Sequence, residues 1–148
     1  MTNVAEELSL SDSELTREHV VRRVEDWKRR IEVLYGRIQQ WIPAGIDVDR
    51  SDFVSMHEEL MQRFAIPPAR LPIMMFSRGG AWLGKIVPQG LWIIGANGRI
   101  DVISPSGRSI LVDRSENFSD SHWLIAPSDH RRQTAALDES TFRKALGI

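Results

Sequence analysis

The chain contains no cysteine among its 148 residues. This absence excludes disulfide bonds, zinc sites built on thiolates and a cysteine nucleophile, and it fits a reducing compartment. The chain also lacks a long apolar run, and its longest falls far short of the roughly 20 residues that a membrane-spanning helix needs. The N-terminal sequence MTNVAEELSL is acidic and has no apolar core, so it does not resemble a secretory signal. We therefore expect a cytoplasmic protein with no membrane partner.

Neither sign of charge dominates the chain. Nineteen basic and 20 acidic residues leave a formal net charge of −1, so the overall charge indicates neither a nucleic-acid partner nor a membrane surface. The hydrophobic content of 42% is that of an ordinary globular protein, and the chain is long enough to bury a core. We expect residues 1–10 to form a flexible leader and residues 11–148 to form a single α+β domain.

Residues 11–45 have the pattern of a long amphipathic helix. Ser11 is placed to cap its start, with Leu10 and Leu15 as a hydrophobic staple, and Pro43 follows its end. Apolar residues recur along it at alternating steps of four and three, a spacing typical of one helical side. We call this set the apolar stripe: Val20, Val24, Trp27, Ile31, Leu34, Ile38 and Trp41.

The length of this helix favours association with another chain. A helix of about 30 residues spans roughly 45 Å, whereas a compact domain of this size is roughly 40 Å across. Part of the apolar stripe is then expected to lack a partner in its own chain, and exposed apolar patches usually mark interfaces. The alternative is that the stripe packs in its own core. We predict a homodimer, or a complex with another protein, with these interface residues: Trp27, Ile31, Leu34, Ile38 and Trp41.

Residues 46–70 predict a second helix followed by a proline-rich turn. Asp49 would cap this helix, and Pro67 with Pro68 would stop it. Its apolar side would comprise Phe53, Met56, His57, Leu60, Met61 and Phe64.

Residues 71–127 change to the pattern of an antiparallel β-meander of about five strands, with residues 122–126 as a sixth. Asn97-Gly98 is the strongest turn signal, because both residues accept the positive φ of a two-residue hairpin. A short helix over 137–147, capped by Asp138 and ended by Gly147, completes the predicted α+β fold. The turn signals are Gly79-Gly80, Pro88-Gln89-Gly90, Asn97-Gly98 and Pro105-Ser106-Gly107.

Catalytic and metal-binding patterns are weak. The spacing of His19, His57, His122 and His130 matches no zinc motif, so we expect no metal and no cofactor. Residues 115–134 contain the serine, histidine and aspartate types of a hydrolase, but no G-x-S-x-G elbow. A solvated loop is the favoured interpretation, and a hydrolase using His122 or His130 is the least favoured function.

One segment is distinctly basic. No acid lies between Glu59 and Asp101, and residues 63–99 contain five bases. A shared sheet face would let some of these bases bind an anion or a nucleic acid. The competing interpretation places them at turns and edges, where they discourage edge-to-edge strand pairing. The candidate anion-binding residues are Arg78, Lys85, Arg99, Arg131 and Arg132.

The sequence thus favours a non-enzymatic protein–protein interaction protein that associates with itself through its long N-terminal helix. The alternative is an anion- or nucleic-acid-binding β-domain that uses residues 63–99.

Overall fold

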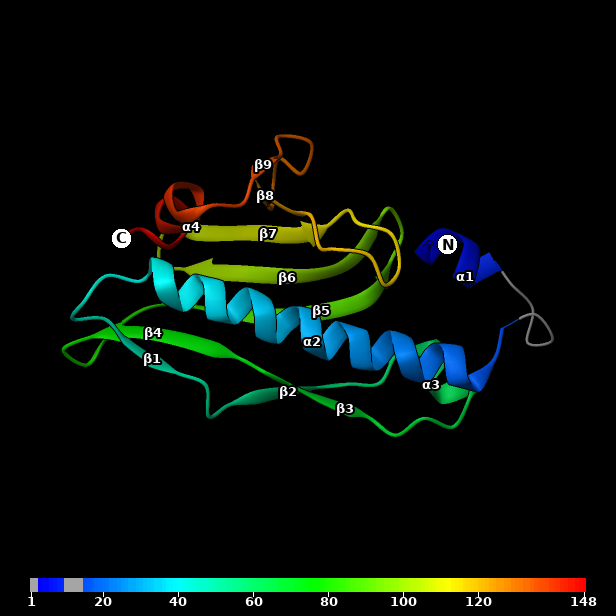
Figure 1. Cartoon of the computed structure of the whole chain (residues 1–148). Coiled ribbons are helices and arrows are strands. Elements are labelled where there is room, and N and C mark those ends of the chain that lie inside the picture. The colour runs from blue at the N-terminus through cyan, green and yellow to red at the C-terminus, as the bar shows by residue number, and fades with distance from the viewer. Residues whose placement is uncertain (1–2, 10–14) are drawn as a thin grey trace.

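The computed structural model describes residues 3–9 and 15–148 and confirms the α+β class (Figure 1). All strand pairs in it are antiparallel. The elements in chain order are α1 (Val4–Ser9), α2 (Arg17–Trp41), β1 (Asp47–Asp49), β2 (Phe53–Met56), α3 (Glu59–Arg63), β3 (Ala69–Pro72), β4 (Met74–Arg78), β5 (Ala81–Ile93), β6 (Ala96–Ser104), β7 (Gly107–Asp113), β8 (Trp123–Pro127), β9 (Ala135–Ala136) and α4 (Glu139–Leu146).

The strands form two sheets on which the long helix lies. The larger sheet has seven strands in the order β1-β4-β5-β6-β7-β8-β9, and β2 pairs with β3 in a second sheet. Helix α2 lies across the large sheet, with β2 and β3 alongside it and α3 near its N-terminal end (Figure 1). The helix is bonded to these elements too: the Tyr35 hydroxyl donates to the carbonyl of Pro72 at 2.7 Å, and Nε of Arg17 donates to the carbonyl of Phe64 at 3.2 Å.

Helix α2 begins later than the sequence predicts. Thr16 has an extended backbone and caps the helix, because its Oγ1 accepts a hydrogen bond of 3.1 Å from the backbone N–H of His19. The expected cap, Ser11, and the staple residue Leu10 lie outside the described residues. The helix ends at Trp41, two residues before Pro43, as expected from the proline.

Part of the expected flexible leader forms helix α1. Glu7 in this helix is fully buried, and its carboxylate accepts hydrogen bonds of 3.0 Å from Nε of Arg23 and of 2.6 Å from Nε2 of His19. These two partners belong to α2. The leader is thus tied to the domain by a buried acid, a role that composition alone does not reveal.

The predicted second helix is largely wrong. Residues 47–49 and 53–56 form strands β1 and β2, and only Glu59–Arg63 is helical. Asp49 does not cap a helix, because its carboxylate accepts the N–H of Ser51 at 2.8 Å and forms a local turn. Phe53 is 47% exposed, with the Arg70 guanidinium 3.5 Å from its ring centroid. Pairing with β3 and β4 supplies the backbone hydrogen bonds that the helix would have made.

The meander is confirmed, but two of its turns are misplaced. Turns lie at residues 79–80 and 105–106 as predicted, and β8 and the capped C-terminal helix are also present. The hairpin between β5 and β6 turns at residues 94–95 instead of at Asn97-Gly98, which lie inside β6. Residues 88–90 lie inside β5, where the pairing register shifts as in a β-bulge.

Candidate functional site

The apolar stripe of α2 lies in the core of its own chain. Trp27, Ile31 and Ile38 are fully buried, Leu34 is 1% exposed, and Trp41 is only partly buried. The five predicted interface residues therefore present no large apolar patch to a second chain. The core cluster that buries the stripe includes side chains of both sheets, of α3 and of α4.

The two faces of the large sheet differ sharply in burial. On the face that contacts α2, Ile86, Ile100, Val102 and Leu111 are almost or fully inaccessible to solvent. On the opposite face the aliphatic side chains of β5 to β8 are mostly half-buried. We call this face the outer face. Its side chains, given by the strand register, are Met75, Lys85, Val87, Arg99, Asp101, Ile103, Arg108, Ile110, Val112, Leu124 and Ala126.

An Arg–Asp–Arg cluster occupies the middle of the outer face. Asp101 is 1% exposed, and its Oδ1 accepts a hydrogen bond of 2.9 Å from Nε of Arg99. Nη1 of Arg108 lies 3.5 Å from the other carboxylate oxygen. Asp101 is thus paired with its neighbours, and the strand register places a second acid, Asp49 opposite Met75, on the same face.

The predicted anion-binding residues are only partly brought together. Lys85 and Arg99 share the outer face, but Arg99 is engaged by Asp101. Arg78 is exposed at the end of β4, and Arg131 and Arg132 are exposed in the loop between β8 and β9. Arg108 was not among the anion-binding residues predicted from the sequence. The strand alternation of β6 and β7 would have found it, because its register partner is Ile103 on the same face.

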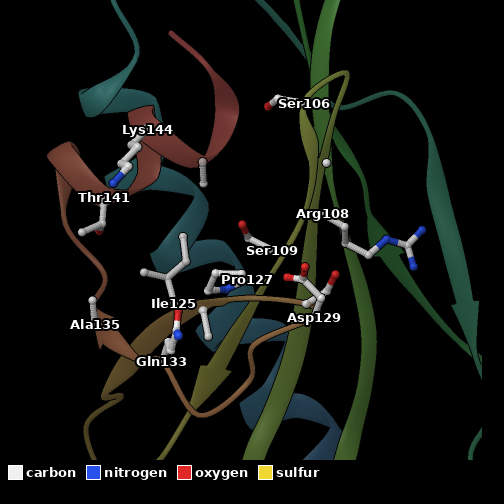
Figure 2. Close-up of a pocket in the computed structure, with 14 residues that line it drawn as sticks. Ser106, Arg108, Ser109, Ile125, Pro127, Asp129, Gln133, Ala135, Thr141 and Lys144 are labelled. Carbon is white, nitrogen blue, oxygen red and sulfur yellow. The ribbon is translucent and has the colours of Figure 1, made fainter.

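A cleft of about 620 Å³ lies between α4, strands β7 and β8 and the loop that follows β8 (Figure 2). Helix α4 contributes Thr141 and Lys144, which face Ser109 across the cavity. Arg108 belongs to the rim, and Figure 2 shows its side chain directed away from α4. The remaining lining residues are Ser106, Gly107, Ile125, Ala126, Pro127, Ser128, Asp129, Gln133, Ala135 and Ala145.

The backbone at the base of this cleft is already paired. Pro127 has no N–H, and its carbonyl accepts a hydrogen bond of 3.1 Å from the N–H of His130. The N–H of Ser128 donates to the carbonyl of Arg108 at 3.0 Å. At these two positions, therefore, no free backbone N–H is available to a ligand.

The polar segment that contains the candidate hydrolase residues is held by buried ion pairs. Arg30 is 2% exposed and donates to Asp26 at 2.6 Å and to Asp113 at 2.7 Å, and it also donates to the carbonyl of Ser119. Burial opposes ionisation of Asp26, but hydrogen bonds from Arg30 and Arg29 outweigh it and lower the pKa of that carboxyl. This cluster attaches the loop after β7 to α2.

The two histidines of this segment have few contacts among the described residues. His130 is exposed, and its Nε2 lies 3.9 Å from the carboxylate of Asp129. His122 is also exposed and uses its backbone N–H to donate to Asp113 at 2.8 Å. Within residues 3–9 and 15–148, no serine or threonine hydroxyl bonds to either imidazole. The arrangement lacks the nucleophile–base contact of a hydrolase.

A second buried cation lies near the N-terminal end of α2. Arg23 is fully buried, and its guanidinium carbon lies 5.9 Å from the ring centroids of both Trp92 and Phe118. Burial lowers the pKa of Arg23, although Glu7 opposes this effect. Burial also raises the pKa of Glu58, whose carboxylate accepts the N–H of Leu91 at 2.8 Å. Glu7 and Arg23 thus join α1 to α2, and Glu58 joins the start of α3 to β5.

Neither a membrane span nor a metal cluster is found in the described part of the chain. None of its helices is both long and apolar enough to cross a membrane. In the same residues, no three histidine, aspartate or glutamate side chains gather in a way that could hold a metal ion. Comparisons of the chain with protein-family models, with curated proteins and with solved structures find no match.

Proposed function

We propose that the protein is a non-enzymatic interaction protein that pairs with a second copy of itself through the outer face. The observation that carries the proposal is the row of half-buried aliphatic side chains on neighbouring strands. Val87, Ile103, Val112 and Leu124 all belong to this face. Contiguous apolar surface of this kind on a folded domain favours association.

The charges of the outer face are compatible with such pairing. Two antiparallel sheets pack face to face at a separation of about 10 Å, with their side chains interdigitated. The paired Arg99 and Asp101 can enter this contact without an isolated charge. Lys85 and Arg108 share one register row, since both are partners of Ile103. A twofold axis near Val112 would keep the two copies' basic rows at opposite ends of the contact.

The test is the mass of the protein in solution, measured by light scattering and sedimentation over a range of concentrations. We expect a dimer for the unaltered chain, and folded monomers for Val112→Glu and Leu124→Glu. Val33→Glu is the matched control, because Val33 is 51% exposed on α2, away from the outer face. A monomer at every concentration would refute the proposal, as would a dimer that survives both outer-face substitutions.

A second candidate function is the binding of an anionic polymer by the same face. It is favoured by the shared register row of Lys85 and Arg108. The expected result is salt-sensitive binding of a labelled single-stranded oligonucleotide, lost in the Lys85→Glu/Arg108→Glu double variant and kept in Lys28→Glu. Absence of binding at low salt would eliminate this candidate.

A further inference from the structure

We propose that the cleft between α4 and strands β7 and β8 binds a small organic anion with an apolar body. This inference does not depend on the outer face or on self-association. It follows from the polar groups, the charges and the size of the cleft.

The cleft contains one cation without a partner. Helix α4 has two bases in its last turn, Arg143 and Lys144. Arg143 already has partners in the fold, since it pairs with Glu139 at 2.7 Å and donates to the carbonyl of Trp41 at 2.8 Å. The side-chain amine of Lys144 has no ion pair or hydrogen bond among the described residues, and Lys144 lines the cavity (Figure 2). Its charge is available to a bound anion.

Two further polar groups are also free to bind. The hydroxyl of Ser109 and the side-chain amide of Gln133 line the cleft and have no side-chain partner in the part of the chain that the structure describes. The hydroxyl of Thr141, by contrast, donates to the carbonyl of Ala136 at 3.0 Å and belongs to the capping box of α4. A ligand would thus meet an ammonium, a hydroxyl and an amide from three separate walls.

The remaining lining predicts the size and charge of the ligand. Ile125, Pro127, Ala135 and Ala145 supply an apolar surface, and about 620 Å³ lies in the range of small-molecule sites. Asp129 also lines the cleft. Lys144 supplies the positive charge that attracts an anion, and Asp129 in the same lining disfavours a ligand with more than one negative charge.

The experiment uses anilinonaphthalene sulfonate, a singly charged apolar anion whose fluorescence rises on binding. We expect saturable binding of one molecule per chain. Lys144→Glu should weaken it about tenfold or more, Lys144→Arg should retain it, and Ala135→Trp should block it. Lys28→Glu is the matched control, because it makes the same change of charge on the surface of α2. Hexanoate should displace the probe better than hexanol of the same chain length.

Three results would overturn the proposal. The first is the absence of saturable binding at millimolar probe. The second is binding that neither Lys144→Glu nor Ala135→Trp weakens, although circular dichroism shows both variants to be folded. The third is loss of binding in Val112→Glu with retention in both cleft variants, which would assign the probe to the outer face. Amide chemical shifts of Ser109, Gln133 and Lys144 in the unaltered chain locate the bound probe without any substitution.

Discussion

The six-membered ring of Trp27 lies against the backbone of Gly98, so closely that a β-carbon at Gly98 would overlap the ring. Gly98 also has φ of +107°, a conformation that side chains rarely allow. Trp27 is fully buried, and its ring centroid lies 6.1 Å from that of Trp123. The contact between helix α2 and strand β6 thus depends on the absence of a single side chain.

Gly98→Ala should therefore destabilise the fold strongly. Strain at positive φ and overpacking against Trp27 together should lower the free energy of unfolding by roughly 2–4 kcal/mol. Urea unfolding measures this change. Gly95→Ala is the control, because Gly95 has φ of +85° but no atom within 4 Å of an added β-carbon. Its cost should be about 1–2 kcal/mol from backbone strain alone. Equal losses in the two variants would contradict the role given to Trp27.

Replacement of Asp113 should destabilise the fold, because the core depends on its buried ion pairs. Its carboxylate accepts from Arg30 at 2.7 Å and from the N–H groups of Ser115 and His122. Asp113→Ala leaves a buried guanidinium short of one partner, so we expect a loss of about 3–5 kcal/mol in unfolding by denaturant.

The exposed ion pair between Arg50 and Glu32 provides the comparison for Asp113→Ala. Glu32 is 56% exposed, so Glu32→Ala should change stability by less than about 1 kcal/mol. A small effect of Asp113→Ala would show that water replaces the lost carboxylate.

Tyr35 should make the fold sensitive to alkali. Burial raises the pKa of its phenol, which donates to the carbonyl of Pro72 at 2.7 Å. The folded chain keeps this proton while the unfolded chain releases it near pH 10, so stability falls as pH rises above about 10. Tyr35 is the only tyrosine, and its near-ultraviolet absorbance therefore reports the ionisation directly.

The expected alkaline titration has tyrosinate appearing together with unfolding, as followed by circular dichroism. In urea the same group should titrate near its ordinary pKa of about 10. Ionisation near pH 10 in the folded chain would contradict the burial of the phenol.

Asp138→Ala should loosen the wall of the cleft. Asp138 accepts the N–H of Thr141 at 2.8 Å, and the Thr141 hydroxyl accepts the N–H of Asp138 at 2.9 Å. Removal of this reciprocal cap should cost about 1 kcal/mol and weaken probe binding in the cleft. Asp138→Asn, which can still accept the hydrogen bond, should preserve both stability and binding.

Periodic and capping patterns predicted much of the fold. The apolar spacing located α2, and the residues at 138 and 147 located α4 together with its caps. The error over residues 46–70 has a physical origin, because a short apolar run that contains both β-branched and straight side chains fits either periodicity. Pairing with strands distant in sequence fixed the strand conformation of this run, as in the pairing of Val54 with Leu71. The turn at Asn97-Gly98 was predicted wrongly because Gly98 allows close packing against Trp27 and does not form a turn.

The candidate sites were less accessible to sequence reasoning. The outer face requires the register of β5 to β8, since Lys85 and Arg108 become neighbours of Ile103 only when these strands pair. The cleft joins residues from the β6–β7 turn to α4, and no local motif connects them. Burial of the apolar stripe depended on how much strand surface lies beneath α2, which the helix sequence does not encode.

The burial of α2 also has a consequence for the newly made chain. Helix α2 ends at Trp41, but its Trp27 packs against Trp123, which is synthesised much later. Ribosomes add roughly 5–20 residues per second, so the stripe spends several seconds without the strands that cover it. The nascent polypeptide, and not the mature domain, is then the species most exposed to aggregation. Synthesis of β8 is the event that closes this interval.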